Sequence, residues 1–247
     1  MRRRSAGVRR AEELLAAKGE AGLGVDTETA IAILEPLVTE ERRTRLQDVI
    51  AARLDSVTVL MDAPHDPHNG GAVVRSCDAF GVQRLHVVER YEPFLVASSV
   101  ARGSEKWVDV IHHRSVDSAA AELRKRGHEF IATDPSGDLE PHDLGRVARP
   151  ALVIGNEREG IAADLRSLCT RAVRVPMRGF TDSLNLSVCT AILLASAVAG
   201  RPGDLPETDR RRLYARGLYL TTPRAAEVLL ERLPEVRARA RGKASDP

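Results

Sequence analysis

Short apolar runs alternate with helical segments from residue 57 onward, and this alternation limits the possible folds more than any other feature of the sequence. Runs such as VTVLM and ALVI are wholly apolar or nearly so. Near-continuous apolar strands are typical of parallel sheets, in which helices cover both faces. Residues 55–200 are therefore predicted to form an α/β domain on a parallel sheet.

Turn and capping residues between the runs set the expected boundaries. The expected strands lie at 57–62, 84–89, 107–113, 128–134, 150–155 and 172–177. The expected helices lie at 69–81, 116–127, 163–169 and 186–199. Ser115 is the expected N-cap of the second helix, and Gly81 and Gly127 are expected to end the first two.

Helical segments flank this domain as two extensions, residues 1–54 and 201–247. The first extension has an expected helix at 1–20, a second capped by Thr27 and a third capped by Thr39. The third helix has an apolar stripe at helical spacing, made of Leu46, Val49, Ile50 and Leu54. The second extension begins with the linker RPGDLP and continues with helical segments at 209–220 and 221–240.

The core is expected to be aliphatic, because 43% of the 247 residues are hydrophobic and only 3% are aromatic. This scarcity also argues against aromatic platforms for nucleic-acid bases. No apolar run is long enough to span a bilayer, and the charged N-terminus is unlike a signal peptide. The three cysteines show no CxxC spacing and are expected to be reduced, which predicts a cytoplasmic protein.

Positive charge is concentrated in the two extensions, although the whole chain has a net charge of only +2. Residues 1–54 carry 10 Lys and Arg against 9 Asp and Glu, and residues 201–247 carry 11 against 7. Arginine suits bidentate contacts to phosphate, so basic arms for a polyanion around a neutral or acidic catalytic body are one interpretation. The alternative is arginine-rich but merely solvated helix faces, and the charges alone favour that alternative.

Residues 174–199 predict a strand, a polar loop and a helix in succession. The apolar run ends at Pro176, and a helix with almost no charge begins at Leu186, which predicts burial of most of its surface. Ser183 or Asn185 is expected to cap its first turn. Such a junction presents free backbone N–H groups and a positive dipole end to a ligand, although ordinary connections share these features.

Two other polar groups lie beside expected strand ends. Asn69 and Arg75 are close to two helical turns apart, so both are expected to face the strand ends. The alternative for Arg75 is a purely structural role, in an ion pair with Asp78. The string GNEREG at 155–160 follows a strand directly, where open α/β sheets bind ligands, and Glu157 adds a carboxylate. The sequence has no dinucleotide fingerprint and no P-loop, so binding of NAD or ATP is not expected. It has no GxSxG elbow, so a hydrolase triad is not expected either.

Several histidines lie near these groups without the spacing of a metal site. They are His65, His68, His112 and His113. No HExxH motif or Cys/His set accompanies them, so no metal is expected.

Three motifs, in this order and spacing, resemble the signature of the SpoU (TrmH-type) RNA ribose 2′-O-methyltransferases of the SPOUT superfamily. They read DAPHDPHNGGAVVRSCDAFGV, LVIGNEREGI and VRVPMRGFTDSLNLSVCTAILL, and the resemblance covers roughly residues 57–199. The basic helical lead-in, the SEKWV segment and the helical C-terminal tail are more narrowly similar to the tRNA (guanosine-18 2′-O) methyltransferases. Residues 1–54 are too short for the extra α/β RNA-binding domain that ribosomal relatives often carry.

The resemblance implies an α/β fold whose C-terminal part makes a deep trefoil knot, and a homodimer in which two subunits complete each site. It also implies S-adenosylmethionine as the cofactor, held by loops around Thr133, at 155–160 and at 175–185. The implied cofactor-binding residues are Thr133, Gly155, Asn156, Gly160, Val175, Pro176, Met177, Ser183, Leu184 and Asn185.

The implied reaction is a one-step methyl transfer to an RNA ribose 2′-OH, which needs positioning and one base. The family gives the base role to the arginine matching Arg75, helped by a substrate phosphate because guanidinium otherwise stays protonated; a purely orienting role is the alternative. The residues matching those that place this arginine and the cofactor are Asn69, Glu157, Ser183 and Asn185. The residues matching tRNA-contacting arginines are Arg43, Arg45 and Arg53.

The sequence departs from the family pattern in two places. Asp66 stands where a basic residue is expected, and the N-terminal segment of about residues 1–38 is longer than in similar chains. The resemblance predicts a cytoplasmic tRNA 2′-O-methyltransferase acting at guanosine 18 in the D-loop, with no membrane partner. The alternatives are the same chemistry on ribosomal RNA and a catalytically inactive RNA-binding protein, although the presence of all five site residues argues against the latter.

Overall fold

The computed structural model describes residues 25–232, which divide into two compact units. The sheet unit contains residues 53–204, and the helical unit contains residues 25–52 and 205–232. Residues 25–52 and 205–232, from the two extensions predicted separately, therefore form one unit, whereas residues 53–54 and 201–204 belong to the sheet unit.

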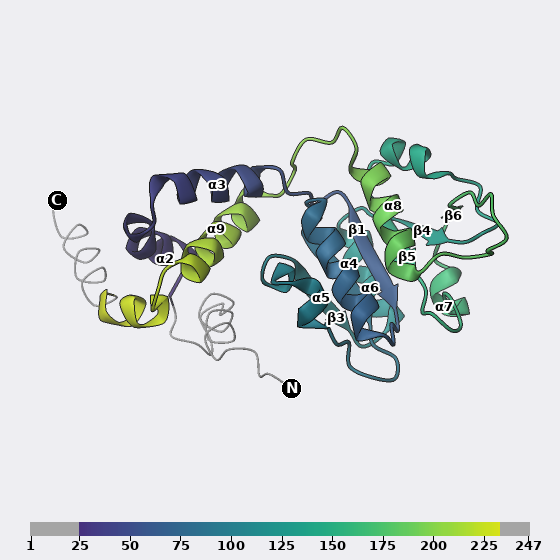
Figure 1. The fold of residues 1–247 in the computed structure, drawn as a ribbon, viewed down its shortest axis with the longest axis horizontal. Coiled ribbons are helices and arrows are strands. Elements are labelled where there is room, and N and C mark those ends of the chain that lie inside the picture. Colours follow the sequence, from purple (N-terminus) through teal and green to yellow (C-terminus); the bar gives the residue numbers. More distant parts are fainter. Residues whose placement is uncertain (1–24, 233–247) are drawn as a thin grey trace. The chain divides into compact units, whose positions relative to one another are not determined.

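Six parallel strands form the centre of the sheet unit (Figure 1). They are β1 (Thr58–Asp62), β2 (Arg84–Val88), β3 (Asp109–His113), β4 (Glu129–Thr133), β5 (Pro150–Ile154) and β6 (Arg171–Val173). Their order across the sheet is β3-β2-β1-β5-β4-β6, and each neighbouring pair is parallel. The predicted α/β fold with a parallel sheet is confirmed.

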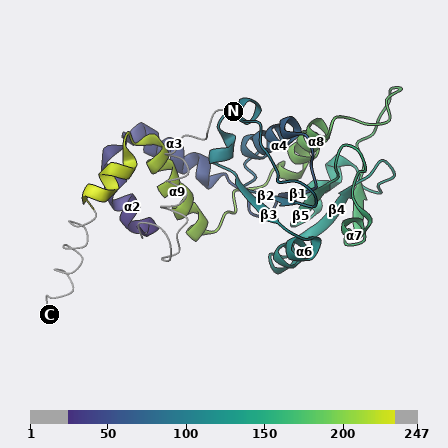
Figure 2. The same ribbon diagram turned by 90° about the horizontal axis from the view of Figure 1, so that it is seen from below.

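Helices cover both faces of this sheet. The helices α4 (Pro67–Ala79) and α8 (Leu186–Val198) lie on one face, and α6 (Val116–Lys125) and α7 (Ala163–Arg166) lie on the other (Figure 2). Val59 and Met61 pack in the α4–α8 core, and the intervening Leu60 packs in the α6 core. Every position of β1 is therefore buried, which explains its continuous apolar run.

Shorter elements complete the sheet unit. They are α5 (Ser98–Ala101) and the 3-10 helices η2 (Ser104–Lys106) and η3 (Pro141–Arg146). The helix α8 packs against α4 and η3, and Arg201, just beyond α8, donates a 2.7 Å hydrogen bond to the carbonyl of Ala148. These contacts fix the direction of α8, whose N-terminus lies beside the loops described below.

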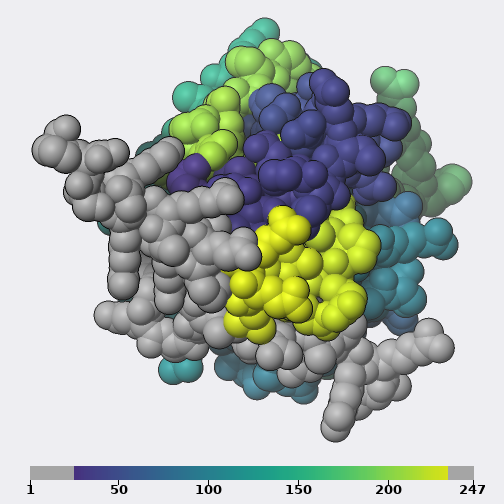
Figure 3. Space-filling model, turned by 90° about the vertical axis from the view of Figure 1, so that its left-hand side faces the viewer, coloured from purple at the N-terminus to yellow at the C-terminus, as the bar shows by residue number. Residues whose placement is uncertain are grey.

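The helical unit contains α2 (Thr27–Leu34), η1 (Glu35–Leu37), α3 (Glu40–Ala51) and α9 (Glu207–Thr221), and a further helix begins at residue 225. Both α2 and α3 pack against α9, and Figure 3 shows the purple start and the yellow end of the described chain in contact. A Cβ at Gly217 would lie 2.8 Å from Cδ2 of Leu46, so this glycine allows α3 and α9 to approach closely.

Most capping predictions are confirmed, and one is wrong. Ser115 accepts a hydrogen bond from Ser118 N–H, and Thr39 accepts one from Arg42 N–H. The N-cap of α2, however, is Asp26 and not Thr27; its carboxylate accepts from Thr29 N–H at 2.9 Å.

Several element boundaries also differ from the prediction, among them the ends of β6 and α7. Strand β6 ends at Val173, whereas a strand to residue 177 was expected. Beyond it, Arg174 N–H donates to the carbonyl of Leu139, and Pro176 has no N–H to continue a ladder with β4. The expected helix at 163–169 is shorter, with α7 ending at Arg166. The helix predicted at 1–20 and the end of the one predicted at 221–240 lie outside the described residues.

Between residues 25 and 232, the helices are all too short or too polar to cross a membrane.

Candidate functional site

Three loops meet at the carboxyl edge of the sheet. Residues 63–66 follow β1, residues 155–162 follow β5, and residues 174–185 lead from β6 to α8. Since β1 and β5 are neighbours and β4 and β6 lie beside them, the loops converge beyond these strand ends. This is the position at which open parallel sheets bind ligands.

Asn69 joins the three loops through its side-chain amide. Its Nδ2 donates to Oε1 of Glu157 at 2.8 Å, and its Oδ1 accepts from Nδ2 of Asn185 at 3.0 Å. Asn69 is 8% exposed, so these two bonds satisfy a buried polar group. The structure thus brings together three of the predicted catalytic residues.

Glu157 is fixed by a second contact, because its Oε2 accepts from His65 N–H at 3.3 Å. Its loop is closed by two backbone hydrogen bonds between Asn156 and Gly160. A Cβ at Gly155 would lie 2.2 Å from the carbonyl carbon of Gly160, so no other residue fits there without moving the loop. Gly155 and Gly160 thus shape the loop itself.

Asn185 has two roles at the start of α8. Its Oδ1 caps the helix by accepting from Ser187 N–H at 2.9 Å, while its Nδ2 reaches Asn69. Of the two predicted caps, Asn185 is therefore the one observed. Ser183 lies exposed in the preceding loop, and its carbonyl accepts from the Thr181 hydroxyl.

Two cavities, of about 610 and 430 Å³, adjoin along these loops, and we call them together the ligand groove. They share Thr133, Ser183, Leu184 and Cys189 in their linings. All ten residues predicted to bind a cofactor line one or both cavities: Thr133, Gly155, Asn156, Gly160, Val175, Pro176, Met177, Ser183, Leu184 and Asn185. The groove combines loop backbone with apolar side chains, as small-molecule sites usually do.

Sequence reasoning missed two contributors to the groove. Cys189 lines both cavities from the first turn of α8, and burial raises its pKa, which makes the thiol a poor nucleophile. His65 contributes only its backbone N–H, for which a sequence carries no signal. Cys189 was detectable, because it lies four residues after Asn185 on the same side of a helix.

Arg75 lies on α4 but lines neither cavity of the groove. Its side chain is exposed, and among the described residues it forms no ion pair. The alternative pairing with Asp78 is wrong, because Asp78 binds the guanidinium of Arg53. The expectation that Asn69 and Arg75 face the same strand ends is also wrong: six residues turn a helix by about 600°, which leaves them about 120° apart.

Arg53 requires a second correction. The resemblance predicts that it contacts RNA, but only 2% of it is exposed and it pairs with Asp78. Arg45 is exposed on α3 and Arg43 is half-buried there, so both remain candidates for RNA contact.

Asp66 has a structural role that explains its departure from the family pattern. Its side chain accepts from His68 N–H at 2.8 Å and caps α4, which therefore begins at Pro67 and not at residue 69. Asp66 thus fixes the first turn of the helix that carries Asn69, whereas the basic residue expected from the family pattern would not cap it.

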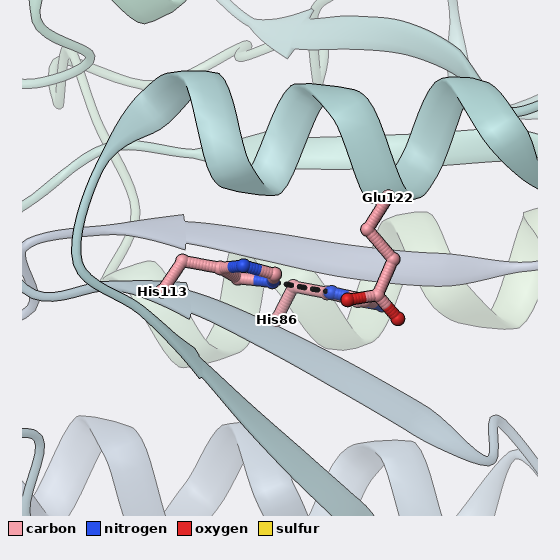
Figure 4. A group of neighbouring side chains, drawn as sticks. All are labelled: His86, His113 and Glu122. Carbon is pink, nitrogen blue, oxygen red and sulfur yellow. Dashed lines mark hydrogen bonds between the residues drawn. The ribbon is translucent and has the colours of Figure 1, made fainter.

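One group of side chains away from the groove has the composition of a metal site. His86, His113 and Glu122 offer ligand atoms that lie within 4.8 Å of one another under α6 (Figure 4). However, Nδ1 of His86 faces Nε2 of His113 at 2.8 Å in a hydrogen bond, so the two lone pairs do not converge on a common point. Burial lowers the pKa of both rings, which keeps them neutral.

Comparisons with known proteins agree with this geometry. The model of the SpoU rRNA Methylase family matches residues 56–195. The tRNA (guanosine(18)-2'-O)-methyltransferase of Escherichia coli (strain K12) is 31% identical over 196 residues, which are 75% of this chain and 86% of that protein.

Two solved structures share the fold. The A. aeolicus TrmH/SpoU tRNA modifying enzyme aligns with a TM-score of 0.66 and 27% identity, over 75% of this chain and 98% of that one. The SpoU methyltransferase AviRb from Streptomyces viridochromogenes, in complex with AdoMet, aligns with a TM-score of 0.51 and 30% identity, over 61% of this chain and 62% of that one. The family match spans more than half of the chain and all three loops of the groove, which confirms the predicted resemblance: the chain belongs to the SpoU rRNA methylase family.

Proposed function

We propose that this protein transfers a methyl group from S-adenosylmethionine to the 2′-OH of a tRNA ribose, at guanosine 18. The observation that carries this proposal is the hydrogen-bonded series Glu157–Asn69–Asn185 at the edge of the ligand groove. It joins the three loops whose motifs resemble the family signature. The E. coli relative named for this reaction supports tRNA as the substrate.

The groove fits S-adenosylmethionine in size and lining. Small-molecule sites usually enclose about 300–1,000 Å³, and each of the two adjoining cavities falls within that range. Leu184 and Met177 would contact apolar parts of the cofactor, and backbone groups of the 155–160 loop would hold its polar edges. When bound, the cofactor supplies a methyl group on a positively charged sulfur.

The chain's own residues supply position and charge for the transfer. Glu157 is held by Asn69 and His65, so its carboxylate stays at the groove edge in one orientation. Arg75 is proposed to orient the ribose and, with a substrate phosphate, to remove the proton from the 2′-OH. Because Arg75 lies outside the groove of its own subunit, this role requires a second copy of the chain.

A homodimer is supported by the exposed side of α8. This helix carries no charged residue, yet Val188 is 47% exposed and Ile192 is 36% exposed. Ala195 and Ala199 continue the exposed stripe at helical spacing. An uncharged stripe of this kind is costly in water and suits an interface between two copies. The helix α4 packs beside α8, which would carry Arg75 toward the groove of the partner subunit.

We also propose the trefoil knot of the family for the C-terminal part of the sheet unit. Its support is the return of the chain from β6, at the edge of the sheet, to α8, which packs against both α4 and η3. The helical unit, with Arg43 and Arg45, is proposed as the part that grips tRNA, and the protein would then act in the cytoplasm.

The test is transfer of labelled methyl from S-adenosylmethionine to unmodified tRNA, followed by nucleoside digestion and position mapping. Label recovered as 2′-O-methylguanosine at position 18 is the expected result. Label in ribosomal RNA but not in tRNA would move the substrate to the ribosome. Cofactor binding without transfer to either RNA would contradict the proposed activity and favour a binding protein.

A further inference from the structure

An ion-pair network centred on a buried aspartate lies at the carboxyl edge of the sheet and contacts one of the loops of the ligand groove. Asp62, the last residue of β1, is 1% exposed, and its two carboxylate oxygens have different partners. Oδ1 accepts from Nε of Arg90 at 2.6 Å, and Oδ2 accepts from Ala162 N–H at 2.8 Å. Arg90 follows β2, and Ala162 follows the loop after β5, so Asp62 joins three neighbouring strands at their carboxyl edge.

Arg90 uses all three guanidinium nitrogens in this network. In addition to its bond with Asp62, it donates to both carboxylate oxygens of Asp164, at 2.9 and 2.6 Å. Asp164 lies in the first turn of α7, immediately beyond Ala162 and Ala163. The hydrogen bonds with Asp164 and then Asp62 raise the pKa of Arg90 above its ordinary value, so the guanidinium charge is permanent.

The network is connected to both sides of the Asn69–Glu157 hydrogen bond. On one side, Asp62 is followed directly by residues 63–66, which lead to Asn69 at the start of α4. On the other side, it binds the backbone N–H that ends the loop carrying Glu157. Moving Asp62 or Ala162 would therefore separate the two side chains that meet at the groove edge.

We propose that Asp62, Arg90 and Asp164 are positioning residues that hold the 155–160 loop in the shape needed to bind S-adenosylmethionine. The cofactor part of this inference rests on the proposed function. Removal of Arg90 would leave the Asp62 carboxylate buried without a counter-charge. Asp62 would then draw in water or a proton, and its bond with Ala162 would no longer fix the loop.

The test compares Arg90→Met, Arg90→Lys and Asp164→Asn in the full-length protein with Arg146→Met as the control. Arg146 pairs with Asp143 on the surface of η3 and touches neither the network nor the groove lining. Hydrogen–deuterium exchange would report on the two loops, and steady-state kinetics would report on each substrate. Thermal unfolding of each variant would verify that exchange is measured on folded protein.

Arg90→Met is expected to speed exchange in residues 63–69 and 155–162 while β4 and the helical unit stay unchanged. The KM for S-adenosylmethionine is expected to rise about tenfold or more, with a smaller fall in kcat and no change in the KM for tRNA. Arg90→Lys keeps the charge and one bond to Asp62, so it should lie between wild type and Arg90→Met. Asp164→Asn should show a smaller rise, and Arg146→Met should match wild type.

Wild-type exchange in both loops together with a wild-type KM for S-adenosylmethionine would overturn the inference. If Arg90→Met does not fold, Asp164→Asn decides in its place by the same two readouts. If the wild-type protein transfers no methyl group, the proposed function fails, but the exchange pattern still decides whether the network positions the loops.

Discussion

Asn69 is the side chain on which the candidate site depends most. A side-chain amide both donates and accepts, so Asn69 can bind the Glu157 carboxylate and the Asn185 amide at the same time. Aspartate would repel Glu157, and alanine would leave both partners unsatisfied. The residue type was predictable from the motif, but its two partners lie 88 and 116 residues away in the chain and only the fold reveals them.

Arg75→Ala is expected to retain the fold and cofactor binding and to lose activity by roughly 10²- to 10⁴-fold, the usual contribution of a general acid or base. The fold should survive because the exposed Arg75 side chain forms no ion pair among the described residues. Circular dichroism and calorimetry with S-adenosylmethionine would verify these points beside the rate. Near-normal turnover would remove Arg75 from the mechanism.

Buried histidines are expected to make the protein less stable as the pH falls below neutral. Burial and then the neighbouring His113 lower the pKa of His86 to about 3, and burial and then Arg149 lower the pKa of His128 to about 4. Unfolding restores ordinary values, so between about pH 6.5 and pH 4 the unfolded chain binds more protons. Stability is therefore complete above pH 6.5 and is lost on acidification.

Urea unfolding between pH 7.5 and 5 would measure this loss. Each of the two histidines should contribute up to about 1.4 kcal/mol per pH unit. A free energy of unfolding that does not depend on pH in this window would show that the two imidazoles take up protons in the folded protein as readily as in the unfolded chain.

At the scale of elements, the sequence predicts most where both sides of a segment are buried. The strands β1 and β5 were predictable because helices cover both faces and demand continuous apolar residues. The end of β6 was not, since it depends on where the pairing with β4 stops. The burial of Arg53 was not predictable either, because its partner Asp78 comes from a distant helix.

The exposed stripe of α8 leads to a prediction about assembly. Ile192→Glu is expected to convert the dimer to a monomer, because an unpaired carboxylate in an apolar interface is costly. Folding of the single subunit should be little affected, because the Ile192 side chain is 36% exposed there. Sedimentation would measure the mass. Ala121→Glu on α6, on the opposite face of the sheet, is the matched control and should remain dimeric. A dimer that tolerates Ile192→Glu would contradict the proposed interface.

At the scale of the whole molecule, residues 25–52 and 205–232 form one helical unit, and this unit is proposed to grip tRNA through arginines such as Arg43 and Arg45. Binding of tRNA should weaken steeply with salt, because each phosphate contact releases counterions. Arg45→Ala should lower the slope of log K against log salt by roughly 0.7–0.9, the value for one phosphate. Filter binding at several salt concentrations would measure this, with Lys125→Ala on α6 as the control. A slope unchanged by Arg45→Ala would exclude this side chain as a phosphate contact.

The groove of one subunit is proposed to act with Arg75 of the other, and mixed dimers of two inactive variants test this arrangement. Arg75→Ala and Asn69→Ala should each be inactive alone. If Arg75 acts across the interface, a mixed dimer has one site with both residues intact, so an equal mixture should regain about a quarter of wild-type methyl transfer to tRNA. A mixture that stays inactive, although the two variants form mixed dimers and bind tRNA, would contradict the account.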